Sequence, residues 1–535
     1  MTTGPPEICP LRSSRRQFTK IAALAPFAFK QVVNQTHADI GQLGGGAHEF
    51  TILYTNDFHS ALDPIPAYWL PHSPKLGGAA HLATLVEQER AAESTTFLLD
   101  SGDMFTGTMS ALTSGEVLME LMTLMRYDAM SVGNHEFDYG WQIFDQAVTR
   151  VPFPILCCNI RYQGTQIRFT RPYTILERNG VRLGVIGVMG LKAARYTIMP
   201  SKVAELEFTD PVAETKACLA ELRDTVDIVV VLGHQGLPGP MQTDAENDPE
   251  VQRPLDEDIA FCGAVSGIDV YLAAHSHHGL EQPIIHPTTG TLITQTYGYG
   301  TRLGRLRLKV KNRRVIAHES TLLKVWSDDL PPHAAVAARM AHYRAIVADK
   351  LGAPIGFAPQ RIIRRYNHEA PLGALITDYM RAHAGSEVAI TNAGGLRADL
   401  PAGPLDRGHA LDAFPFINHA VTLALKGRDL QAVLEHGFSL KAGMVQASGL
   451  RAVYDLARPS GARLVELQIG GHPVEPERIY RVTTNSFLAE GGDGYLAFKH
   501  GREISRGSLL SDLLVTSIQA HPNIELPALG RLVRG

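Results

Sequence analysis

Cysteine is scarce in this sequence, with five residues in 535 and no CxxC motif. Cys157 and Cys158 are adjacent, which is a poor geometry for bonding to each other. Cys9 falls in the N-terminal segment, Cys218 in a helical pattern and Cys262 near an apolar run. The spacing therefore excludes a disulfide framework, and buried free thiols are the expected state.

The chain also lacks a large excess of either sign of charge, because 50 Lys and Arg residues nearly balance 54 Asp and Glu residues and the formal net charge is only -4. No stripe rich in lysine and arginine carries interleaved aromatic residues, so a nucleic-acid polymer is not an expected partner. Hydrophobic residues make up 45% of the chain and charged residues 19%, as in ordinary soluble globular proteins. The chain is too long for a single core, and about two or three domains are expected.

Long hydrophobic runs are missing as well. The apolar run 21–29 falls well short of the ~20 residues that span a bilayer, so a permanent transmembrane anchor is not expected. Arg15 and Arg16 precede this run, and a basic segment followed by a short apolar one is typical of an export signal. Twin arginines indicate the Tat route. We expect residues 1–38 to be a Tat signal peptide, the Tat export machinery to be a partner, and the location to be periplasmic or extracellular.

Short apolar runs alternate with amphipathic helical patterns between about residues 48 and 325. The expected strands lie within 50–57, 95–103, 128–134, 153–160, 182–190, 227–234 and 267–275. Helical patterns at 81–93 and 211–225 separate some of them. Near-continuous runs of Val, Ile and Leu suit sheets that are covered on both faces. The pattern predicts an α/β layered sandwich with its function at the strand ends.

The chain after residue 300 predicts how this first domain ends. Residues 302–320 alternate with period two around Asn312, which predicts a closing hairpin. The segment 330–354 opens with proline, ends with glycine and proline, and carries its apolar residues on one helical face. We expect a catalytic domain at 48–325, a connecting helix at 330–354, and a second domain at 355–535.

Residues of metal-ligand type stand at or just past the ends of the expected strands. They are Asp57, His59, Asp103, Asn134, His135, His234, His275 and His277. Asp, Asn and neutral His without Cys suit a hydrolytic site with two divalent ions of Mn, Zn, Fe or Co. A lone histidine at a strand end is more often an ordinary polar residue, but the recurrence in separate segments favours a metal site.

Spacing within these segments suggests how the ligands are presented. In Asp57-x-His59 and His275-x-His277, both side chains are expected on one side of an extended segment, because the side-chain period of a strand is two. Asp103 is the expected bridge, since one carboxylate can bind both ions and offset their mutual repulsion.

The stretch "SVGNHEFDYG" (131–140) concentrates polar groups on an expected turn. We expect Asn134 to coordinate a metal and His135 to face the substrate. Asp138 can hydrogen-bond the other ring nitrogen and favour the protonated form of His135, which could stabilise phosphoryl oxygens or protonate a leaving oxygen. The alternative is that Asp138 is only a turn or cap residue. Glu136 is expected to face structure or solvent.

These motifs resemble a known family. "NDFHS", "SGDMFTGT", "GNHEFDYG", "LGHQG" and "AHSHH" are similar to the metallophosphatase motifs of the 5'-nucleotidase family. "ITNAGGLR" (390–397), "FPFINHAV" (414–421) and "NSFLAEGGDGY" (485–495) resemble its C-terminal half. The resemblance runs from about residue 48 to the end. It implies a four-layer, calcineurin-like metallophosphatase sandwich joined by a helix to an α+β substrate-binding domain, and a dinuclear-metal hydrolase that acts on nucleotides.

The resemblance also implies residue roles. One metal would be held by Asp57, His59, Asp103 and His277, and the other by Asp103, Asn134, His234 and His275. His135 and Asp138 match a catalytic dyad, Arg397 a phosphate-binding arginine, Phe416 and Phe487 an aromatic pair that sandwiches the base, and Asp493 a ribose-contacting acid. Arg361 and Arg365 match two further phosphate-binding arginines, with Arg364 as a competitor. His277 stands where some members carry Gln, and the spacing from Arg365 to "PLG" (371–373) is one residue off the family pattern.

Physical chemistry supports these roles, and alternatives stay open. The planar arginine fork suits phosphate oxygens, and stacking on an aromatic ring is worth ~1–3 kcal/mol per base. The same pocket could serve UDP-sugars or 2',3'-cyclic nucleotides. The sulfur-oxidation thiosulfohydrolases resemble this family too, but a sulfate-releasing site has no evident use for Phe416 and Phe487. A non-catalytic nucleotide-binding surface protein would have no need of His135.

Overall fold

The structure is a computed structural model that describes residues 47–68, 70–238 and 255–535. The expected signal peptide, 1–38, and Cys9 lie outside the described residues. Within the described residues, no helix is both long enough and apolar enough to cross a membrane. Cys157, Cys158, Cys218 and Cys262 are free and buried, as the sequence predicts.

Two six-stranded sheets build the first half of the described chain. The first has the order β16-β15-β1-β4-β5-β6 and the second the order β13-β14-β12-β11-β9-β8. Their bounds are β1 (His48–Thr55), β4 (Thr96–Asp100), β5 (Ala129–Ser131), β6 (Ile155–Leu156), β15 (Arg302–Lys311) and β16 (Arg314–Lys324), then β8 (Tyr173–Arg178), β9 (Val181–Met189), β11 (Ile228–His234), β12 (Val270–Leu272), β13 (Ile284–Ile285) and β14 (Leu292–Thr294). Strands β1, β4, β5 and β6 run parallel, as do β9, β11, β12 and β14.

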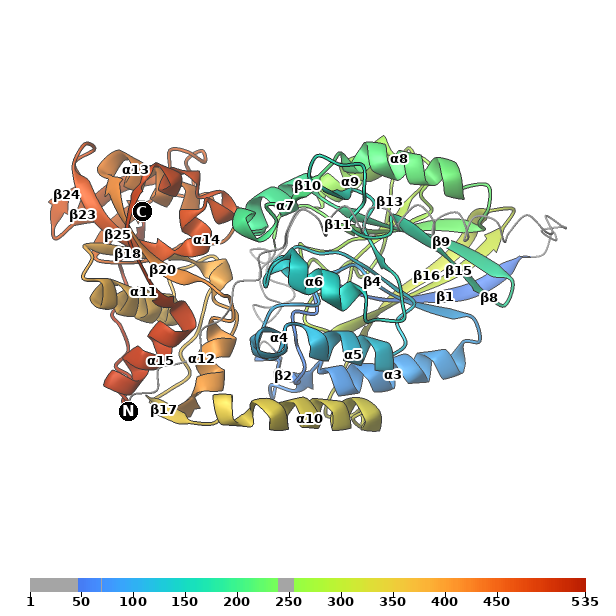
Figure 1. Ribbon diagram of the computed structural model, residues 1–535, viewed down its shortest axis with the longest axis horizontal. Coiled ribbons are helices and arrows are strands. Elements are labelled where there is room, and N and C mark those ends of the chain that lie inside the picture. Colours follow the sequence, from blue (N-terminus) through green and yellow to red (C-terminus); the bar gives the residue numbers. More distant parts are fainter. Residues whose placement is uncertain (1–46, 69, 239–254) are drawn as a thin grey trace, which may run out of the picture. The chain divides into compact units, whose positions relative to one another are not determined.

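Helices cover the outer face of each sheet, which gives four layers (Figure 1). Between the sheets lies an apolar core that includes Ile52, Leu99 and Val230. The helices of the first sheet are α3 (Ala79–Ala92), α4 (Thr108–Thr113), α5 (Glu116–Leu124) and α6 (Trp141–Val148), and those of the second are α8 (Pro211–Leu222) and α9 (Asp256–Ala264). Helix α7 (Leu191–Thr197) packs its buried alanines into the core on the side of the first sheet's helices. Strands buried on both faces explain why their sequences are almost continuously apolar.

Several local predictions can be compared with the elements. The run 153–160 is not one strand, because it divides into β6 and β7 (Ile160–Tyr162), and β7 pairs with β10 (Leu206–Phe208) in a separate ribbon. The predicted hairpin turns at Asn312 and Arg313, whose φ angles of 52° and 59° fit a tight two-residue turn. Helix α10 (Ala334–Leu351) lies in the expected connecting segment and packs against α3 and α5.

The second half is built on a five-stranded sheet of order β21-β18-β25-β20-β26, with a four-stranded sheet of order β24-β23-β22-β27 and the pair β17-β19. Helices α11 and α15 cover one face of the larger sheet and α13 the other (Figure 1). The bounds are β17 (Pro354–Ala358), α11 (Pro371–Ala384), β18 (Val388–Asn392), β19 (Gly403–Asp406), α12 (Arg407–Ala413), β20 (His419–Lys426), α13 (Gly427–Gly437), β21 (Val445–Ser448), β22 (Leu450–Tyr454), β23 (Leu464–Ile469), β24 (His472–Pro473), β25 (Ile479–Asn485), α14 (Ser486–Ala489), β26 (Arg502–Leu509), α15 (Leu510–Ala520) and β27 (Leu532–Arg534).

Candidate metal centre and substrate pocket

The predicted metal ligands gather at the C-terminal ends of five parallel strands. Asp57 and His59 follow β1, Asp103 follows β4, Asn134 follows β5, His234 ends β11, and His275 and His277 follow β12. Parallel strands end at the same edge of a sheet, so residues far apart in sequence meet there. All of these side chains are buried.

One cluster consists of Asp57, His59 and His277. His59 Nε2 lies 3.0 Å from His277 Nε2, and His277 Nε2 lies 3.4 Å from Asp57 Oδ1. The possible ligand atoms of this cluster are all within 4.8 Å of one another. Converging imidazole and carboxylate groups of this kind are a common divalent-ion site.

The second cluster consists of Asp103, His234 and His275, whose ligand atoms also lie within 4.8 Å of one another. His234 Nε2 is 3.2 Å from Asp103 Oδ2 and 3.0 Å from Asn134 Oδ1. Asp103 Oδ2 also lies 4.0 Å from His59 Nε2 of the first cluster. Asp103 therefore stands between the two clusters, in the position expected of a bridging carboxylate.

The electrostatics of the site favour a bound cation. Burial, with the Arg397 guanidinium, lowers the pKa of His59 well below its usual value, and burial with the nearby His234 lowers the pKa of His275 to about 3. Burial would lower the pKa of His234 too, but Asp103 raises it to about 10. Neutral imidazoles and ionised carboxylates are the forms that bind metals, and His234 shows that the carboxylates favour a positive charge here.

Two imidazole nitrogens give a further indication. Within the described residues, His275 Nε2 and His59 Nδ1 are buried without a hydrogen-bond partner. A buried polar atom without a partner costs about 1–3 kcal/mol of stability. A metal ion bound to His275 Nε2 would give that atom a partner and would remove this cost. The residues present therefore fit divalent metal ions.

The backbone at these ligands corrects one prediction. Asp57, His59, Asp103, His275 and His277 have φ angles of 50°, 47°, 63°, 71° and 55°, so the D-x-H and H-x-H segments are left-handed turns and not extended strands. Each such angle costs a non-glycine residue about 1–3 kcal/mol. Hydrogen bonds between the loops hold this conformation, including Asp57 N to Gly102 O at 2.9 Å and His59 N to Asp103 O at 3.0 Å.

Glu136 anchors the loop that carries Asp103. This buried carboxylate accepts the backbone N–H groups of Asp103, Met104 and Phe105 at 2.9, 2.9 and 3.2 Å. It also accepts the N–H of Gly133 at 2.7 Å. Of the two environments expected for Glu136, structure and solvent, the side chain occupies the first. Its four backbone bonds fix the distance between the β4 and β5 loops.

Gly133 should not tolerate a side chain, because an added Cβ would lie 2.2 Å from Asp103 Oδ1 and 2.5 Å from Asp103 N. We expect Gly133→Ala to displace the Asp103 loop, to lower the free energy of unfolding by about 1–3 kcal/mol, and to weaken metal affinity about 10–100-fold. Denaturant melts and metal titration measure both. Gly507→Ala in β26, where a Cβ meets no atom closer than 3.6 Å, is the matched control. Unchanged metal affinity in Gly133→Ala would contradict the expectation.

His135 and Asp138 form a hydrogen-bonded pair. His135 Nδ1 lies 3.1 and 3.0 Å from the two carboxylate oxygens of Asp138. Burial disfavours the imidazolium, but Asp138 and Asp103 together raise the pKa of His135 above its usual value. His135 Nε2 points the other way, 4.0 Å from Asp103 Oδ2 and 3.3 Å from Arg397 Nη2.

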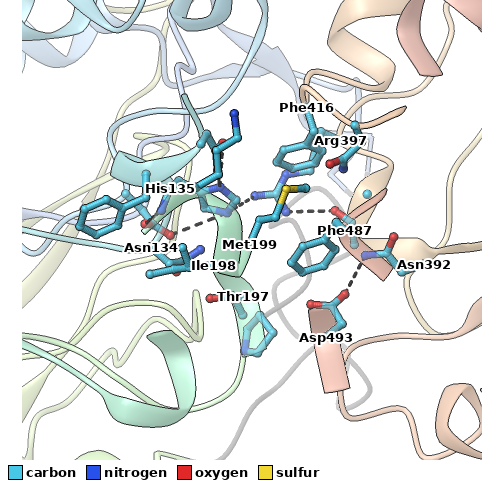
Figure 2. A pocket seen from close by; sticks show the side chains of 18 of the residues that line it. Asn134, His135, Thr197, Ile198, Met199, Asn392, Arg397, Phe416, Phe487 and Asp493 are labelled. Carbon is cyan, nitrogen blue, oxygen red and sulfur yellow. Dashed lines mark hydrogen bonds and ion pairs between the residues drawn. The ribbon is translucent and has the colours of Figure 1, made fainter. Parts of the chain in front are cut away.

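A pocket joins this pair to the second half of the chain (Figure 2). Its lining includes Asp103, Asn134, His135, Asp138, His275, His277, Asn392, Arg397, Phe416, Phe487 and Asp493. The Phe416 ring stacks on His135 with centroids 5.8 Å apart. Arg397 lies close to both rings, with Nη2 3.3 Å from His135 Nε2 and Cζ 5.5 Å from the Phe416 centroid. Metal-type ligands, a dyad, a guanidinium and two aromatic rings therefore share one pocket.

Asp493 lies at the end of this pocket with Asn392. Asn392 Nδ2 donates to Asp493 Oδ2 at 2.7 Å, and burial raises the pKa of Asp493 to about 6. Asp493 has a φ of 54° within a glycine-rich turn. The backbone turn thus aims the carboxylate of the half-buried Asp493, the predicted ribose contact, into the pocket.

The upstream arginines are not brought to the pocket lining. Arg361 stacks on Tyr68, with Cζ 3.7 Å from the ring centroid, and its Nε lies 3.3 Å from Asp399. Arg365 is exposed, whereas Arg364 between them is buried. The prediction that Arg361 and Arg365 bind phosphate therefore gains no geometric support. This segment is largely irregular, so an i, i+4 spacing does not bring the two side chains together here, and phosphate binding by Arg361 and Arg365 stays a prediction.

Other pocket residues were missed by the sequence reasoning. Asn392 ends β18, so the rule that polar residues follow buried strands could have found it. Ile198, Met199 and Lys202 also line the pocket, just after α7. They carry no sequence signal, since an Ile and a Met in a loop are ordinarily packing residues.

Comparisons with known proteins agree with this geometry. Residues 50–279 match the calcineurin-like phosphoesterase family, and residues 353–500 match the 5'-nucleotidase C-terminal domain. A snake venom 5'-nucleotidase of Naja atra is 27% identical over 509 residues, which cover 85% of this chain and 92% of that protein. Endonuclease YhcR of Bacillus subtilis is 27% identical over 462 residues and 82% of this chain, but the chain spans only 37% of its length.

Solved structures show the same architecture. The 5'-nucleotidase precursor of Thermus thermophilus is 26% identical and superposes with a TM-score of 0.80, covering 91% of this chain and 99% of that one. The sulfate thiohydrolase SoxB of Thermus thermophilus reaches a TM-score of 0.75 at 20% identity, covering 93% and 98% of the two chains. At that identity the likeness to SoxB concerns the fold alone.

The layered sheets and the His/Asp groups able to bind metals at their edge define a metallophosphoesterase with a calcineurin-like N-terminal domain. Within that class, the chain belongs to the 5'-nucleotidase family, whose C-terminal domain it also carries. The resemblance and the fold class inferred from the sequence are thereby confirmed.

Proposed function

We propose that the protein removes phosphate from nucleotides with two divalent metal ions and the His135–Asp138 dyad. The observation that carries this proposal is the shared pocket, in which the dyad and members of both ligand clusters line the same cavity as Arg397 and Phe416. Mn, Zn, Co and Fe are the candidate ions, because the donors are carboxylate, amide and imidazole without thiolate.

The pocket residues divide the work of catalysis. Metal ions bound by the two clusters would lower the pKa of a water molecule and would polarise the phosphoryl group toward attack. Arg397 donates hydrogen bonds to phosphate oxygens, as a planar guanidinium does. His135 Nε2, oriented by Asp138 at Nδ1, stabilises the developing charge or protonates the leaving oxygen. Phe416 and Phe487 stack on the base, and Asp493 accepts hydrogen bonds from the ribose.

The substrate class we favour is nucleoside 5'-monophosphates, with di- and triphosphates, UDP-sugars and 2',3'-cyclic nucleotides as alternatives that the same pocket could admit. The aromatic pair supports a nucleotide over a small sulfur anion, because a flat apolar slot binds a base and gains nothing from a sulfate. A pure binding module has no need of the dyad. The location remains part of the proposal: Arg15 and Arg16 support Tat export to the periplasm or beyond.

Substrate selectivity tests the proposal. We expect Mn-loaded protein to release phosphate from AMP, UMP or ATP with a much higher kcat/KM than from para-nitrophenyl phosphate. Loss of ~1–3 kcal/mol of stacking per ring predicts that Phe416→Ala with Phe487→Ala lowers kcat/KM for nucleotides by about 25-fold or more, with little effect on the nitrophenyl ester. UDP-glucose and 2',3'-cyclic AMP complete the panel.

The control for these variants is Phe357→Ala in β17, because that ring is half exposed and does not line the pocket. Equal activity on every ester, insensitive to the double change, would indicate a general phosphatase. No turnover on the whole panel would move the weight to a thiohydrolase or a binding protein.

A further inference from the structure

Thr106 has the most unusual backbone near the dyad. Its φ of 85° is left-handed, although a β-branched residue is a true outlier in that region. Its side chain is buried in the turn between β4 and α4. Conformational strain of this kind persists only where the surroundings enforce it, and it concentrates at functional sites.

The surroundings enforce it from both sides. Phe105 N is held by Glu136 at 3.2 Å, and the Phe105 ring packs edge-on against Phe144 with centroids 5.7 Å apart. On the other side, a Cβ at Gly107 would lie 2.8 Å from Ser60 Cβ, so the chain passes too closely for any side chain. Thr106 is therefore pinned between two fixed neighbours, and its hydroxyl has a defined direction.

The Thr106 hydroxyl points toward the His135–Asp138 dyad. Thr106 Oγ1 donates a hydrogen bond to Asp138 Oδ2 and lies 3.0 Å from His135 Nδ1. A hydroxyl has one proton and two lone pairs. Since the proton points to the carboxylate, a lone pair is left to accept the Nδ1–H of His135. The imidazole is then held at Nδ1 by Asp138 and Thr106 together, and Nε2 is the nitrogen that faces the pocket.

We propose that Thr106 is a positioning residue of the dyad, and that its hydroxyl fixes Asp138 and the Nδ1–H group of the His135 imidazolium, so that the Nε2 proton is the one transferred. This inference rests on the proposed function. In that reaction, water adds to phosphorus and loses a proton to solvent, the phosphorus–oxygen bond to the nucleoside breaks, and the proton on His135 Nε2 passes to the leaving oxygen. The left-handed backbone at Thr106 is what directs its hydroxyl to both members of the pair.

The test compares Thr106→Val, which keeps the shape and removes the hydroxyl, with Thr106→Ser, which keeps the hydroxyl. We expect Thr106→Val to lower kcat for AMP about 10–100-fold, as loss of an orienting partner does, with KM within about two-fold of wild type. The loss should be much smaller for para-nitrophenyl phosphate, whose leaving group departs without a proton. Thr106→Ser should restore most of the AMP activity.

Thr113→Val is the matched control, because the hydroxyl of Thr113 donates to Met109 O within α4 and Thr113 does not line the pocket. Metal content of each variant is measured alongside. Equal losses on both substrates, a serine variant as impaired as the valine variant, unchanged AMP turnover in Thr106→Val, or a fall in its metal content would each overturn the inference. An inactive wild type would instead refute the proposed function, so the two failures are distinguishable.

Discussion

Asp103→Asn protein is expected to keep its fold, to bind at least one metal ion fewer per chain, and to lose phosphatase activity by about 10³-fold or more. Asp103 Oδ2 is the carboxylate oxygen that approaches both clusters, 3.2 Å from His234 Nε2 and 4.0 Å from His59 Nε2. A bound metal ion supplies several kcal/mol of transition-state stabilisation, and every ~1.4 kcal/mol is a factor of ten in rate. The amide preserves shape but removes the charge that offsets two cations.

Metal content by elemental analysis after dialysis, and kcat for AMP, are the measurements. Asp349→Asn, at an exposed position on α10, makes the same chemical change away from the site and should match wild type in both. Treating wild type with a chelator should reproduce the loss, and added Mn²⁺ should restore activity to wild type but not to Asp103→Asn. Full metal content in Asp103→Asn would show that this carboxylate does not bridge.

His135→Ala should lower kcat for nucleotides about 10²–10⁴-fold while metal content stays at the wild-type level. His135 is the pocket residue that presents a ring nitrogen on Asp138 and the opposite nitrogen toward Arg397. General acid catalysis and charge stabilisation each contribute factors of this size. Because its ring is tied to Asp138 at Nδ1, we expect it to act on the phosphoryl group and not to hold a metal.

Steady-state kinetics with AMP and elemental analysis separate these roles. His472→Ala, in the exposed strand β24, controls for the loss of an imidazole. Unchanged kcat would remove the dyad from the mechanism. A fall in bound metal would make His135 a ligand, which the grouping of its side chain with His59 and Asp103 permits geometrically.

The ligand set could be predicted because strand ends are visible in sequence. Apolar runs that stop at Asp57, Asp103, Asn134, His234 and His275 identify buried parallel strands, and such strands must end together at one edge. The local geometry could not be predicted in the same way. Asp57 and His275 have left-handed φ angles, and their N–H groups donate to loops of other strands, Asp57 to Gly102 O and His275 to the Asp57 carboxylate. The period-two rule contains no information about those loops.

The second half of the chain shows more clearly which site residues can be predicted from sequence and which cannot. The sequence motifs predicted four substrate-binding residues that all line the pocket, namely Arg397, Phe416, Phe487 and Asp493. The i, i+4 spacing also predicted Arg361 and Arg365 as phosphate-binding residues. In the structure, Arg361 contacts Tyr68 and Asp399 and does not line the pocket. An arginine side chain is long and satisfied equally by a carboxylate, a ring or a phosphate, so its position depends on which of these the fold places nearby.

The sequence by itself determined the class of protein, because the order of apolar runs, polar strand ends and glycine-rich turns can be recognised without knowing how the chain folds. Only the tertiary structure decided how those ends become a site. Glu136 accepts a backbone hydrogen bond from the Asp103 loop, and Thr106, with its left-handed backbone, places its hydroxyl against the His135–Asp138 pair. These contacts join separate β–loop segments, and their energies exist only once the sheet has brought the strand ends together.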